Sequence, residues 1–590
     1  MLTMLLMPVD AFALNKQQQL FKKTYQLALK GDEKAVKSAQ IQLPDYLLLH
    51  YLDYALLKAK IPQLPIKEID AFKQAHPKSP LNKVLENLLV YELGKQGKWQ
   101  AYLARYHDNK SSKTKHCWYL QARIATKKLK GLNQAIENTW MNGLSLPEAC
   151  DSVFKWWEKQ GQLTDKKLEK RIKLAFKVNN ASTARYLASK MKKQPSWVKN
   201  AIKLMQAPSK TFTQSLQWAD NMQNRELIYL KSKSLASKRP DYMHKMWAEL
   251  KKHFQFSAKQ AATVERTIAL YAATDYLPFT IDAMNKLPPN YHDAQINAWK
   301  VRYYLYHKKW RKVYRTIKAM PDFQRNKDNW QYWLARSAAK IKKKDLARKI
   351  FARLAKKTNY YGFLAADHMH LPYQFCSNDI PAKPIKKLPI ETQRAFELFA
   401  LDMIYLARKE WMIGYRQLDL GQRRALAEIA LQKGWYNKTA AIMAALDLRN
   451  NYPLRYPLGY KDEITKLATK YNLQPQWIMS IITQESAWQT DAISRADARG
   501  LMQLIHPTAE RLSKKLKLNY QGKQQLHDAD FNLQLGIFYQ KELFARFNHP
   551  VLALASYNAG ETKAHHWLQD FPTSPDMWAE TIPYRETRDY

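Results

Sequence analysis

The stretch QPQWIMSIITQESAWQTDAISRADARGLMQLIHPTAERL, residues 474–512, holds the most informative pattern in the chain. Ile481 and Ile482 follow Ile478 by three and four residues, which places all three on one face of a helix. Glu485 continues this spacing, so its carboxyl group lies at the end of the apolar stripe. Lost hydration disfavours the charged form and raises the pKa toward that of a general acid at neutral pH. The alternative is a helix-end glutamate whose head turns to water.

Further motifs follow Glu485-Ser486 in a fixed order. GLMQ occupies residues 500–503, SYNAG residues 556–560 and IPYRETR residues 582–588. The ordered set of ES, GLMQ, YNAG and IPY-ETR resembles the soluble lytic murein transglycosylases, a periplasmic family of Gram-negative bacteria with a lysozyme-like domain. Weaker similarity to the family's ring-shaped helical domain extends upstream, through LPDYLLLHYLDY (43–54) and DNWQYWLARSAAK (328–340).

The resemblance assigns a role to individual side chains. Glu485 matches the single catalytic acid and base, and Ser494 matches a serine near the N-acetyl group of the sugar. Tyr557 matches a tyrosine whose hydroxyl supports the catalytic centre. The remaining residues expected to bind the glycan are Met502, Gln503, Asn558 and Glu586.

The chain departs from the family pattern at four places. Asp497-Ala498 replaces the usual Gly-Ala before GLMQ, and the proline after GLMQ comes one place late, as His506-Pro507. Residues 560–563 read Gly-Glu-Thr-Lys instead of Gly-Pro-Gly-Arg, and relatives continue past Tyr590 with a final helix. These differences leave the shape of the groove and the C-terminal packing open, but none affects Glu485.

The expected reaction needs only one acid. Ordinary glycosidases place two carboxylates across the scissile bond, whereas we expect Asp491, Asp497 and Glu510 to be solvated. The resemblance implies that Glu485 cleaves the β-1,4 bond between N-acetylmuramic acid and N-acetylglucosamine without water and leaves 1,6-anhydromuramic ends. We therefore expect an enzyme that needs no cofactor and no metal. A hydrolytic muramidase and a non-catalytic cell-wall scaffold are the alternatives.

The composition predicts an all-α protein. Only 15 of 590 residues are glycine, which disfavours sandwiches, barrels and dinucleotide folds, and helix-forming residues dominate. Amphipathic segments such as 44–59, 165–178, 329–341 and 344–356 follow one another without a strict period, as in helical solenoids.

Four domains are expected along the chain. Residues 1–13 form a signal-peptide remnant, and residues 14–375 form a helical solenoid, whose shape in the resembled family is a ring. A proline-rich segment then leads into a small helical linker domain at 376–452. Residues 453–590 form the lysozyme-like catalytic domain.

The positive charge is concentrated in the N-terminal part. The chain carries 96 Lys and Arg against 51 Asp and Glu, a net charge of +45. Residues 451–590 hold 16 basic and 15 acidic side chains, so nearly all of the excess lies before them. Such a field attracts polyanions. We expect peptidoglycan strands as the partner, with other cell-wall enzymes as candidates, and a monomer; nucleic-acid binding lacks a supporting motif.

The N-terminus and the three cysteines bear on the compartment. An apolar run ends in Ala11-Phe12-Ala13, a small-x-small cleavage pattern, although no basic residue precedes it. Spacing alone favours buried free thiols at Cys117 and Cys150, whereas the resemblance implies a disulfide between them, with Cys376 unpaired. No metal-binding cysteine motif occurs, and no apolar run is long enough to span a membrane. We expect the periplasm of a Gram-negative bacterium.

Overall fold

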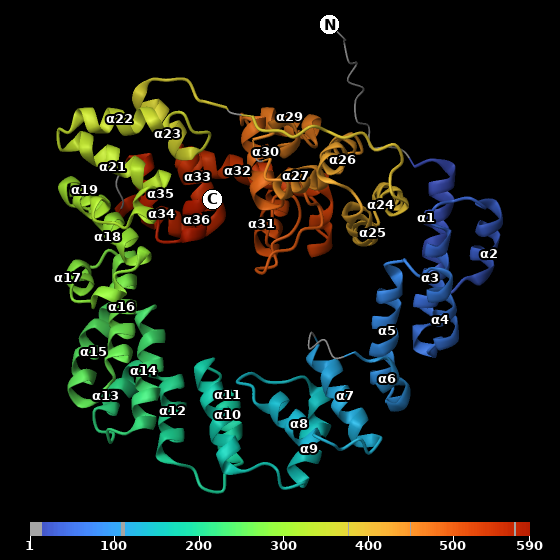
Figure 1. The fold of residues 1–590 in the computed structure, drawn as a ribbon, viewed down its shortest axis with the longest axis horizontal. Coiled ribbons are helices and arrows are strands. Elements are labelled where there is room, and N and C mark those ends of the chain that lie inside the picture. The colour runs from blue at the N-terminus through green and yellow to red at the C-terminus, as the bar shows by residue number, and fades with distance from the viewer. Residues whose placement is uncertain (1–13, 108–111, 376, 449, 571–573) are drawn as a thin grey trace. The chain divides into compact units, whose positions relative to one another are not determined.

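A computed structural model describes residues 14–107, 112–375, 377–448, 450–570 and 574–590 of the chain. Every regular element within these ranges is a helix, and two isolated β-bridges, Ile493 with Arg499 and Arg499 with Leu504, are the only extended pairing. The all-α fold class is therefore confirmed (Figure 1). The expected signal segment, residues 1–13, and Cys376 lie outside the described residues.

The helices of the N-terminal half are short and follow one another closely. They are α1 (Lys16–Ala28), α2 (Glu33–Gln42), α3 (Leu49–Ala59), the 3-10 helix η1 (Ile61–Gln63), α4 (Ile66–Ala75), α5 (Leu81–Lys95), α6 (Trp99–Arg105), α7 (Lys113–Ala125), α8 (Leu132–Trp140), η2 (Glu148–Cys150), α9 (Asp151–Lys159), α10 (Asp165–Lys177), α11 (Ala181–Ser189), α12 (Ser196–Gln206), α13 (Pro208–Ser215), α14 (Met222–Ala236), α15 (Pro240–His253), α16 (Ala258–Thr274), α17 (Thr280–Asn285) and η3 (Pro289–Tyr291).

The second half continues in the same way. Its helices are α18 (Ala294–Tyr306), α19 (Trp310–Lys318), α20 (Asp322–Arg325), α21 (Asp328–Lys340), α22 (Lys344–Leu354), α23 (Tyr360–Met369), α24 (Ile390–Ala400), α25 (Ile404–Arg416), α26 (Leu420–Gln432), α27 (Tyr436–Ala445), α28 (Tyr452–Arg455), α29 (Lys461–Lys470), α30 (Pro475–Glu485), α31 (His506–Leu516), η4 (Lys523–His527), α32 (Ala529–Phe547), α33 (Pro550–Ala559), α34 (Glu561–Asp570), α35 (Pro575–Thr581) and α36 (Arg585–Asp589).

The expected helices match these bounds closely, with one difference. The predicted segments 165–178, 329–341 and 344–356 correspond to α10, α21 and α22. The segment predicted from residue 44 becomes helical only at Leu49. The residues before it form turns, in which Tyr46 N–H donates to Leu43 O and Leu49 N–H to Tyr46 O, both at 3.1 Å.

The contacts divide the chain into two compact units. One consists of residues 19–299, and the other combines residues 14–18 with residues 300–590. The second unit therefore includes α19–α23, which the sequence assigns to the solenoid. The expected domain boundaries at residues 375 and 452 stay predictions.

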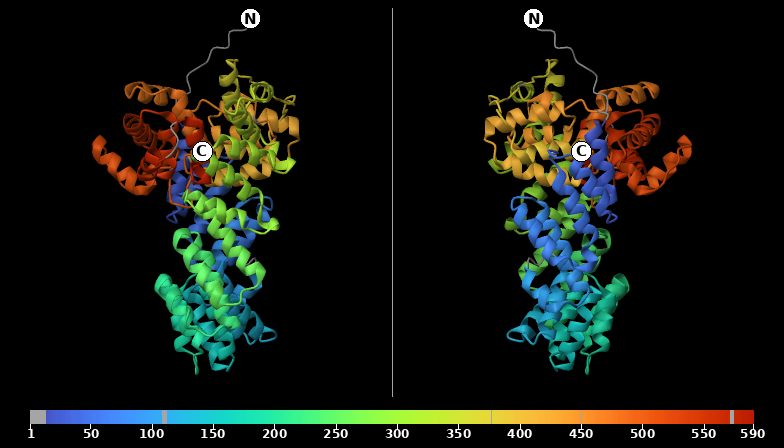
Figure 2. Two further views of the ribbon diagram at one scale, coloured as in Figure 1. Left: turned by 90° about the vertical axis from the view of Figure 1, so that its left-hand side faces the viewer. Right: turned by 90° about the vertical axis from the view of Figure 1, so that its right-hand side faces the viewer.

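The unit of residues 19–299 is a stack of helices, each packed mainly on its neighbours in the chain (Figure 2). Helix α10 illustrates how the sequence produces such an element. The Thr164 hydroxyl accepts a hydrogen bond from Lys167 N–H at the N-cap, and Leu168, Ile172 and Phe176 face the shared core. Lysines occupy much of the opposite face, which leaves the apolar stripe as the packing surface.

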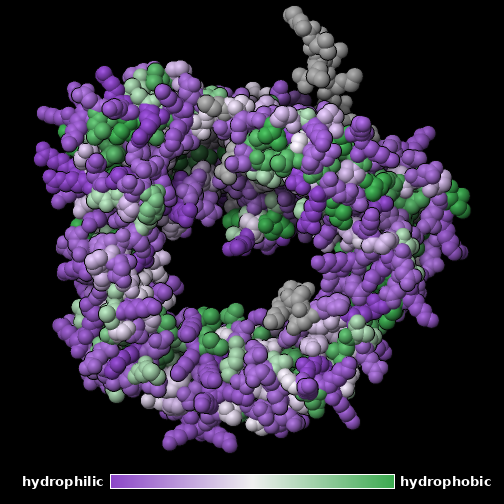
Figure 3. All heavy atoms as spheres, in the orientation of Figure 1, coloured by the Kyte–Doolittle hydropathy of each residue, from purple (hydrophilic) through white to green (hydrophobic). Residues whose placement is uncertain are grey.

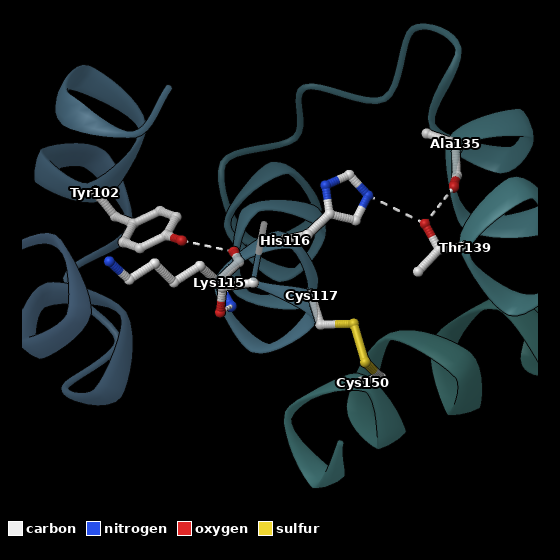
Figure 4. The surroundings of a disulfide bond; sticks show 8 residues. Tyr102, Lys115, His116, Cys117, Ala135, Thr139 and Cys150 are labelled. Carbon is white, nitrogen blue, oxygen red and sulfur yellow. Dashed lines mark hydrogen bonds between the residues drawn. A yellow bond between two sulfur atoms is a disulfide. The ribbon is translucent and has the colours of Figure 1, made fainter. Parts of the chain in front are cut away.

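A disulfide connects α7 to η2 within this unit (Figure 4). Cys117 and Cys150 are both fully buried, and their Cα atoms lie 4.9 Å apart. The pairing that the family resemblance implied is thus confirmed. Helix α7 is also fixed by the Tyr102 hydroxyl, which donates to Lys115 O at 2.6 Å, and by the contact of His116 with Thr139 at 3.1 Å.

In the other unit, α35 is bound to α18, α21 and α23 through one buried carboxylate. Glu580 accepts hydrogen bonds from Arg302 at 3.0 Å, Trp333 at 3.0 Å and Tyr361 at 2.9 Å. Because removal of one partner would leave a buried charge uncompensated, these bonds hold α35 firmly.

The surface is largely hydrophilic, with scattered apolar residues on the face drawn in Figure 3. Within the described part of the chain, no helix combines the length and the apolar composition needed to cross a membrane. The same residues contain no group of three or more His, Cys, Asp or Glu side chains arranged to hold a metal ion.

The disulfide predicts the thiol content of the folded protein. Under denaturing, non-reducing conditions, the purified chain should show one reactive thiol, that of Cys376. The Cys117→Ala/Cys150→Ala variant should lose about 2–4 kcal/mol of stability, because it frees a 33-residue loop in the unfolded state. A count of three thiols in protein purified from an oxidising compartment would contradict the pairing.

Candidate active site

The helix α30 carries Glu485 at its C-terminal end. Ile478, Ile481 and Ile482 are fully buried or nearly so, and they pack into the core beneath the site. Pro475 occupies the first turn, where its missing N–H needs no partner. The apolar stripe predicted from the sequence is therefore present, and it leaves the Glu485 carboxyl half-buried at its end.

The loop after Glu485 is fixed by hydrogen bonds from the helices α25 and α27. The Arg408 guanidinium on α25 binds the Asp491 carboxylate through two hydrogen bonds of 2.7 Å. Asn437 on α27 donates from its side chain to Ala487 O at 3.0 Å. The backbone turns sharply here, since Ala487 and Trp488 both have positive φ. External contacts therefore hold a loop that its own backbone would not favour.

The GLMQ segment is shaped by Asn532, a buried residue of α32. Its side chain accepts a hydrogen bond from Met502 N–H at 2.8 Å and donates to Arg499 O at 3.0 Å and Leu526 O at 2.9 Å. Gly500 has φ +80°, and a Cβ atom there would overlap Leu526 O. Glycine at this position and asparagine opposite it thus define the path of the backbone.

Met502 does not line a groove, contrary to the expectation from the family resemblance. Its side chain is fully buried in the core and lies against Gly536, where a Cβ atom would overlap its sulfur. A side chain without exposed surface cannot bind a glycan. Its carbonyl oxygen instead accepts a hydrogen bond of 2.6 Å from the Tyr557 hydroxyl.

Tyr590 is a member of the site that the sequence analysis missed. Its hydroxyl donates a hydrogen bond of 2.8 Å to Oε1 of Glu485. It lies four residues after Glu586, and its N–H donates to Glu586 O at 2.8 Å. A helical spacing of four puts the two side chains on one face. This spacing from a predicted site residue was the available signal.

The Glu485 carboxyl is balanced between its two protonation states. Burial raises its pKa, the negative charge of Glu586 raises it further, and the hydrogen bond from Tyr590 lowers it; the result is about 7. The direction is the one that the apolar stripe predicts. Burial and the neighbouring Glu485 also raise the pKa of the half-buried Tyr557, which keeps this phenol neutral.

The hydrogen bonds of Ser494, Gln503 and Asn558 go to neighbouring segments of the chain and not to the Glu485 carboxyl. The exposed Ser494 accepts hydrogen bonds on Oγ from Ala498 N–H at 3.0 Å and Ala496 N–H at 3.3 Å. The Gln503 side-chain amide donates hydrogen bonds to Ala492 O and Gly500 O. The Asn558 side chain accepts a hydrogen bond from the Thr587 hydroxyl. The Glu586 side chain is exposed.

The three nearby carboxylates are ion-paired. Burial raises the pKa of Asp491, but the hydrogen bonds and charge of Arg408 outweigh it and hold that pKa below its usual value. Lys523 and Arg499 lower the pKa of Asp497. Exposed Glu510 pairs with Lys514 at 3.1 Å. Our expectation that all three are merely solvated was therefore wrong for Asp491, which is half-buried.

Two family models match the chain. Residues 462–576 match the Transglycosylase SLT domain, and residues 386–447 match the Soluble lytic murein transglycosylase L domain. The soluble lytic murein transglycosylases of Salmonella typhimurium and Escherichia coli K12 are each 25% identical to the chain, over 93% of its length and 86% of theirs.

Solved structures agree with this assignment. An inactive mutant of a Pseudomonas aeruginosa lytic transglycosylase, in which glutamine replaces a glutamate, is 27% identical with a TM-score of 0.77. The 70-kDa soluble lytic transglycosylase of Escherichia coli is 24% identical and shares the fold with a TM-score of 0.83. Both matches cover 98% of the chain and 95% of the other protein. The chain belongs to the soluble lytic murein transglycosylases.

The Arg408–Asp491 pair should stabilise the site measurably. At pH 7, Arg408→Ala should lower the free energy of unfolding by about 1–2 kcal/mol, because it leaves a half-buried carboxylate without its partner. The folded pKa of Asp491 is depressed, so this contribution is present above the unfolded pKa near 3.8 and is lost as the pH falls through the folded pKa.

Thermal unfolding at several pH values checks this prediction. Arg585→Ala is the matched control, because Arg585 pairs with Asp589 at 3.3 Å on an exposed helix face. Equal effects of the two substitutions at neutral pH would contradict the proposed role of the pair.

Proposed function

We propose that this lytic transglycosylase cleaves the β-1,4 bond between N-acetylmuramic acid and N-acetylglucosamine of peptidoglycan, with Glu485 as its only acid and base. The supporting observation is the half-buried Glu485 carboxyl, whose pKa of about 7 contrasts with the ion-paired carboxylates around it. At this pKa both protonation states are populated near neutral pH, as one group needs to give and then take a proton.

In the first step, protonated Glu485 donates its proton to the glycosidic oxygen. The bond between this oxygen and C1 of the muramic sugar breaks, and its electron pair stays with the oxygen. N-acetylglucosamine leaves as the alcohol. The carbonyl oxygen of the muramic N-acetyl group stabilises the positive charge at C1, which replaces the second carboxylate of ordinary glycosidases.

In the second step, the Glu485 carboxylate removes the proton of the C6 hydroxyl of the same sugar. The C6 oxygen bonds to C1, which closes the 1,6-anhydro ring and consumes no water. Because the nucleophile belongs to the substrate, its effective concentration is high. Glu485 ends protonated and is ready for the next bond.

The other side chains of the site orient the reactants. The Tyr590 hydroxyl holds one carboxyl oxygen of Glu485, so the other, Oε2, remains for proton transfer. Tyr557 fixes the GLMQ backbone through Met502 O and stays neutral beside Glu485. For Ser494 we keep the role near the N-acetyl group, because its Oγ accepts two backbone hydrogen bonds and its own O–H can donate to the substrate.

The remaining expected binding residues keep their roles as part of this proposal. Gln503 and Asn558 are both half-buried, and Glu586 is exposed on α36. Their side chains would contact the glycan beside the cleaved bond. The periplasm of a Gram-negative bacterium is the proposed compartment, in line with the disulfide and with relatives from Salmonella and Escherichia.

The substitution Glu485→Gln tests the assignment of the acid. It should reduce murein cleavage by at least 10²–10⁴-fold, because the amide cannot donate or accept the proton, and should change stability by less than about 1 kcal/mol. Glu510→Gln, at an exposed glutamate that pairs with Lys514, is the control and should retain full activity. A folded Glu485→Gln protein with the parent's activity would refute the assignment.

The chemical form of the product separates the transglycosylase from a hydrolytic muramidase. Mass spectrometry of soluble products from purified murein should find muramic ends that are lighter by one water than the hydrolysis product. Reducing muramic ends would establish a muramidase instead. No release of fragments by the folded protein would favour a cell-wall scaffold.

The substitution Tyr590→Phe should change the pH profile. Loss of the hydrogen bond to the ionised carboxylate raises the pKa of Glu485 above about 7, by about one unit. Since the first step requires protonated Glu485, the decline of kcat/KM at alkaline pH should move upward. Glu586 and Tyr557 also face Glu485, and both remain in the variant.

Tyr584→Phe is the matched control, because the Tyr584 side chain is exposed and its hydroxyl donates to no group among the described residues. Its profile should follow that of the parent. An unshifted alkaline limb in Tyr590→Phe would contradict the role of this hydrogen bond.

A further inference from the structure

A basic hollow lies where two inter-helix turns meet in the unit of residues 300–590. The turn from α18 to α19 and the turn from α21 to α22 form its walls, and α19 packs against α21 (Figure 1). Its volume is about 420 Å³. The lining consists of Trp310, Ile341 and five cations, which are Lys309, Arg311, Lys312, Lys340 and Lys342. It shares no residue with the active site.

The five cations have no anionic partner in the described part of the chain. All five are exposed, and no acidic side chain lines the hollow. This differs from arginines of the same unit with structural roles, such as Arg302 and Arg408, which pair with Glu580 and Asp491. Cations gathered without a counter-charge repel one another, so this grouping of charges does not itself stabilise the fold.

Neighbouring groups respond to this positive field. Burial lowers the pKa of Lys300, and the charge of Lys312 lowers it further. Burial and then Lys309 lower the pKa of His307 in the same way. A bound anion would relieve the repulsion at both places.

An aromatic face adjoins these charges. Trp310 is half-buried, and the Lys340 ammonium lies 6.0 Å from the centre of its ring. A flat aromatic surface packs against the apolar face of a sugar ring, and lysine and arginine bind carboxylates. A polymer with both features is an acidic glycan. Murein has sugar rings and, on its stem peptides, carboxylates.

We propose that this hollow is a second, non-catalytic murein-binding site, which holds the carboxylates of stem peptides on the cations and a sugar ring on Trp310. The proposal rests on the proposed function for its choice of murein over other polyanions. Its role would be to keep the enzyme on the polymer between cleavage events, because attraction at a charged site raises the local concentration of substrate.

Binding to purified murein sacculi at low salt tests the proposal. The protein is the full chain with Glu485→Gln, so that cleavage does not interfere, and the readout is cosedimentation. Adding Lys309→Gln/Lys312→Gln should weaken binding about fivefold or more. The control is Lys22→Gln/Lys23→Gln, which removes two exposed charges from α1 and should change binding less than twofold. Equal effects of both pairs, or none, would overturn the proposal.

Two further arms identify the recognised chemistry. On sacculi whose free carboxylates have been converted to amides, the parent should bind as weakly as the Lys309→Gln/Lys312→Gln protein. Trp310→Ala should also weaken binding to sacculi. Trp310→Phe, which keeps an aromatic ring, should bind as the parent does. Binding to duplex DNA is measured in the same way. If the protein binds DNA more tightly than murein, and if Lys309→Gln/Lys312→Gln weakens DNA binding as well, the hollow is a nucleic-acid site instead.

A separate readout distinguishes this proposal from the proposed function. With Glu485 intact, the Lys309→Gln/Lys312→Gln protein should cleave short soluble muropeptides at the parent's rate, because the hollow lies outside the catalytic machinery. If the parent cleaves neither muropeptides nor sacculi but still shows the lysine-dependent binding, the function is wrong and the binding site stands.

Discussion

The half-buried carboxyl group of Glu485 is the constraint on which the rest of the catalytic unit depends. Its apolar surroundings and Glu586 favour the neutral form, and the Tyr590 hydroxyl favours the charged form. The balance at a pKa of about 7 lets one group act as acid and then as base. Such a balance requires fixed geometry, because a small rotation of the carboxyl group would expose it to water or break the hydrogen bond.

The surrounding structure supplies this fixed geometry from several separate segments. Arg408 and Asn437 hold the loop after Glu485, Asn532 holds the GLMQ backbone, and the buried Glu580 fixes α35 ahead of the helix that leads to Tyr590. Each of these bonds joins residues far apart in the sequence. Helices α21, α25 and α27, which all precede α30 in the chain, thus take part in the support of the active site.

The sequence was sufficient for the features that depend on local pattern. The apolar stripe that ends at Glu485, the all-helical composition and most helix bounds follow from residue spacing and propensity. The disulfide came from the family resemblance, since spacing alone favoured free thiols. Three features depend on tertiary contacts and were not predictable in this way: the donor role of Tyr590, the burial of Met502 against Gly536 and the pairing of Asp491 with Arg408. The four-residue spacing from Glu586 places Tyr590 on the same helix face but does not show that its hydroxyl reaches Glu485. Neither the burial of Met502 nor an ion pair between residues 83 positions apart leaves a periodic signal in the chain.

A direct titration of the Glu485 carboxyl tests the central claim. Difference infrared spectra between the parent and the Glu485→Gln protein, recorded as a function of pH, isolate the C=O stretch of this one protonated carboxyl group. Because the carboxyl group lies in apolar surroundings, the band should disappear with a midpoint near pH 7, well above the ordinary glutamate value of 4.5. A midpoint near 4.5 would show that the carboxyl group is solvated and would rule out Glu485 as a group that is balanced between its acid and base forms at neutral pH.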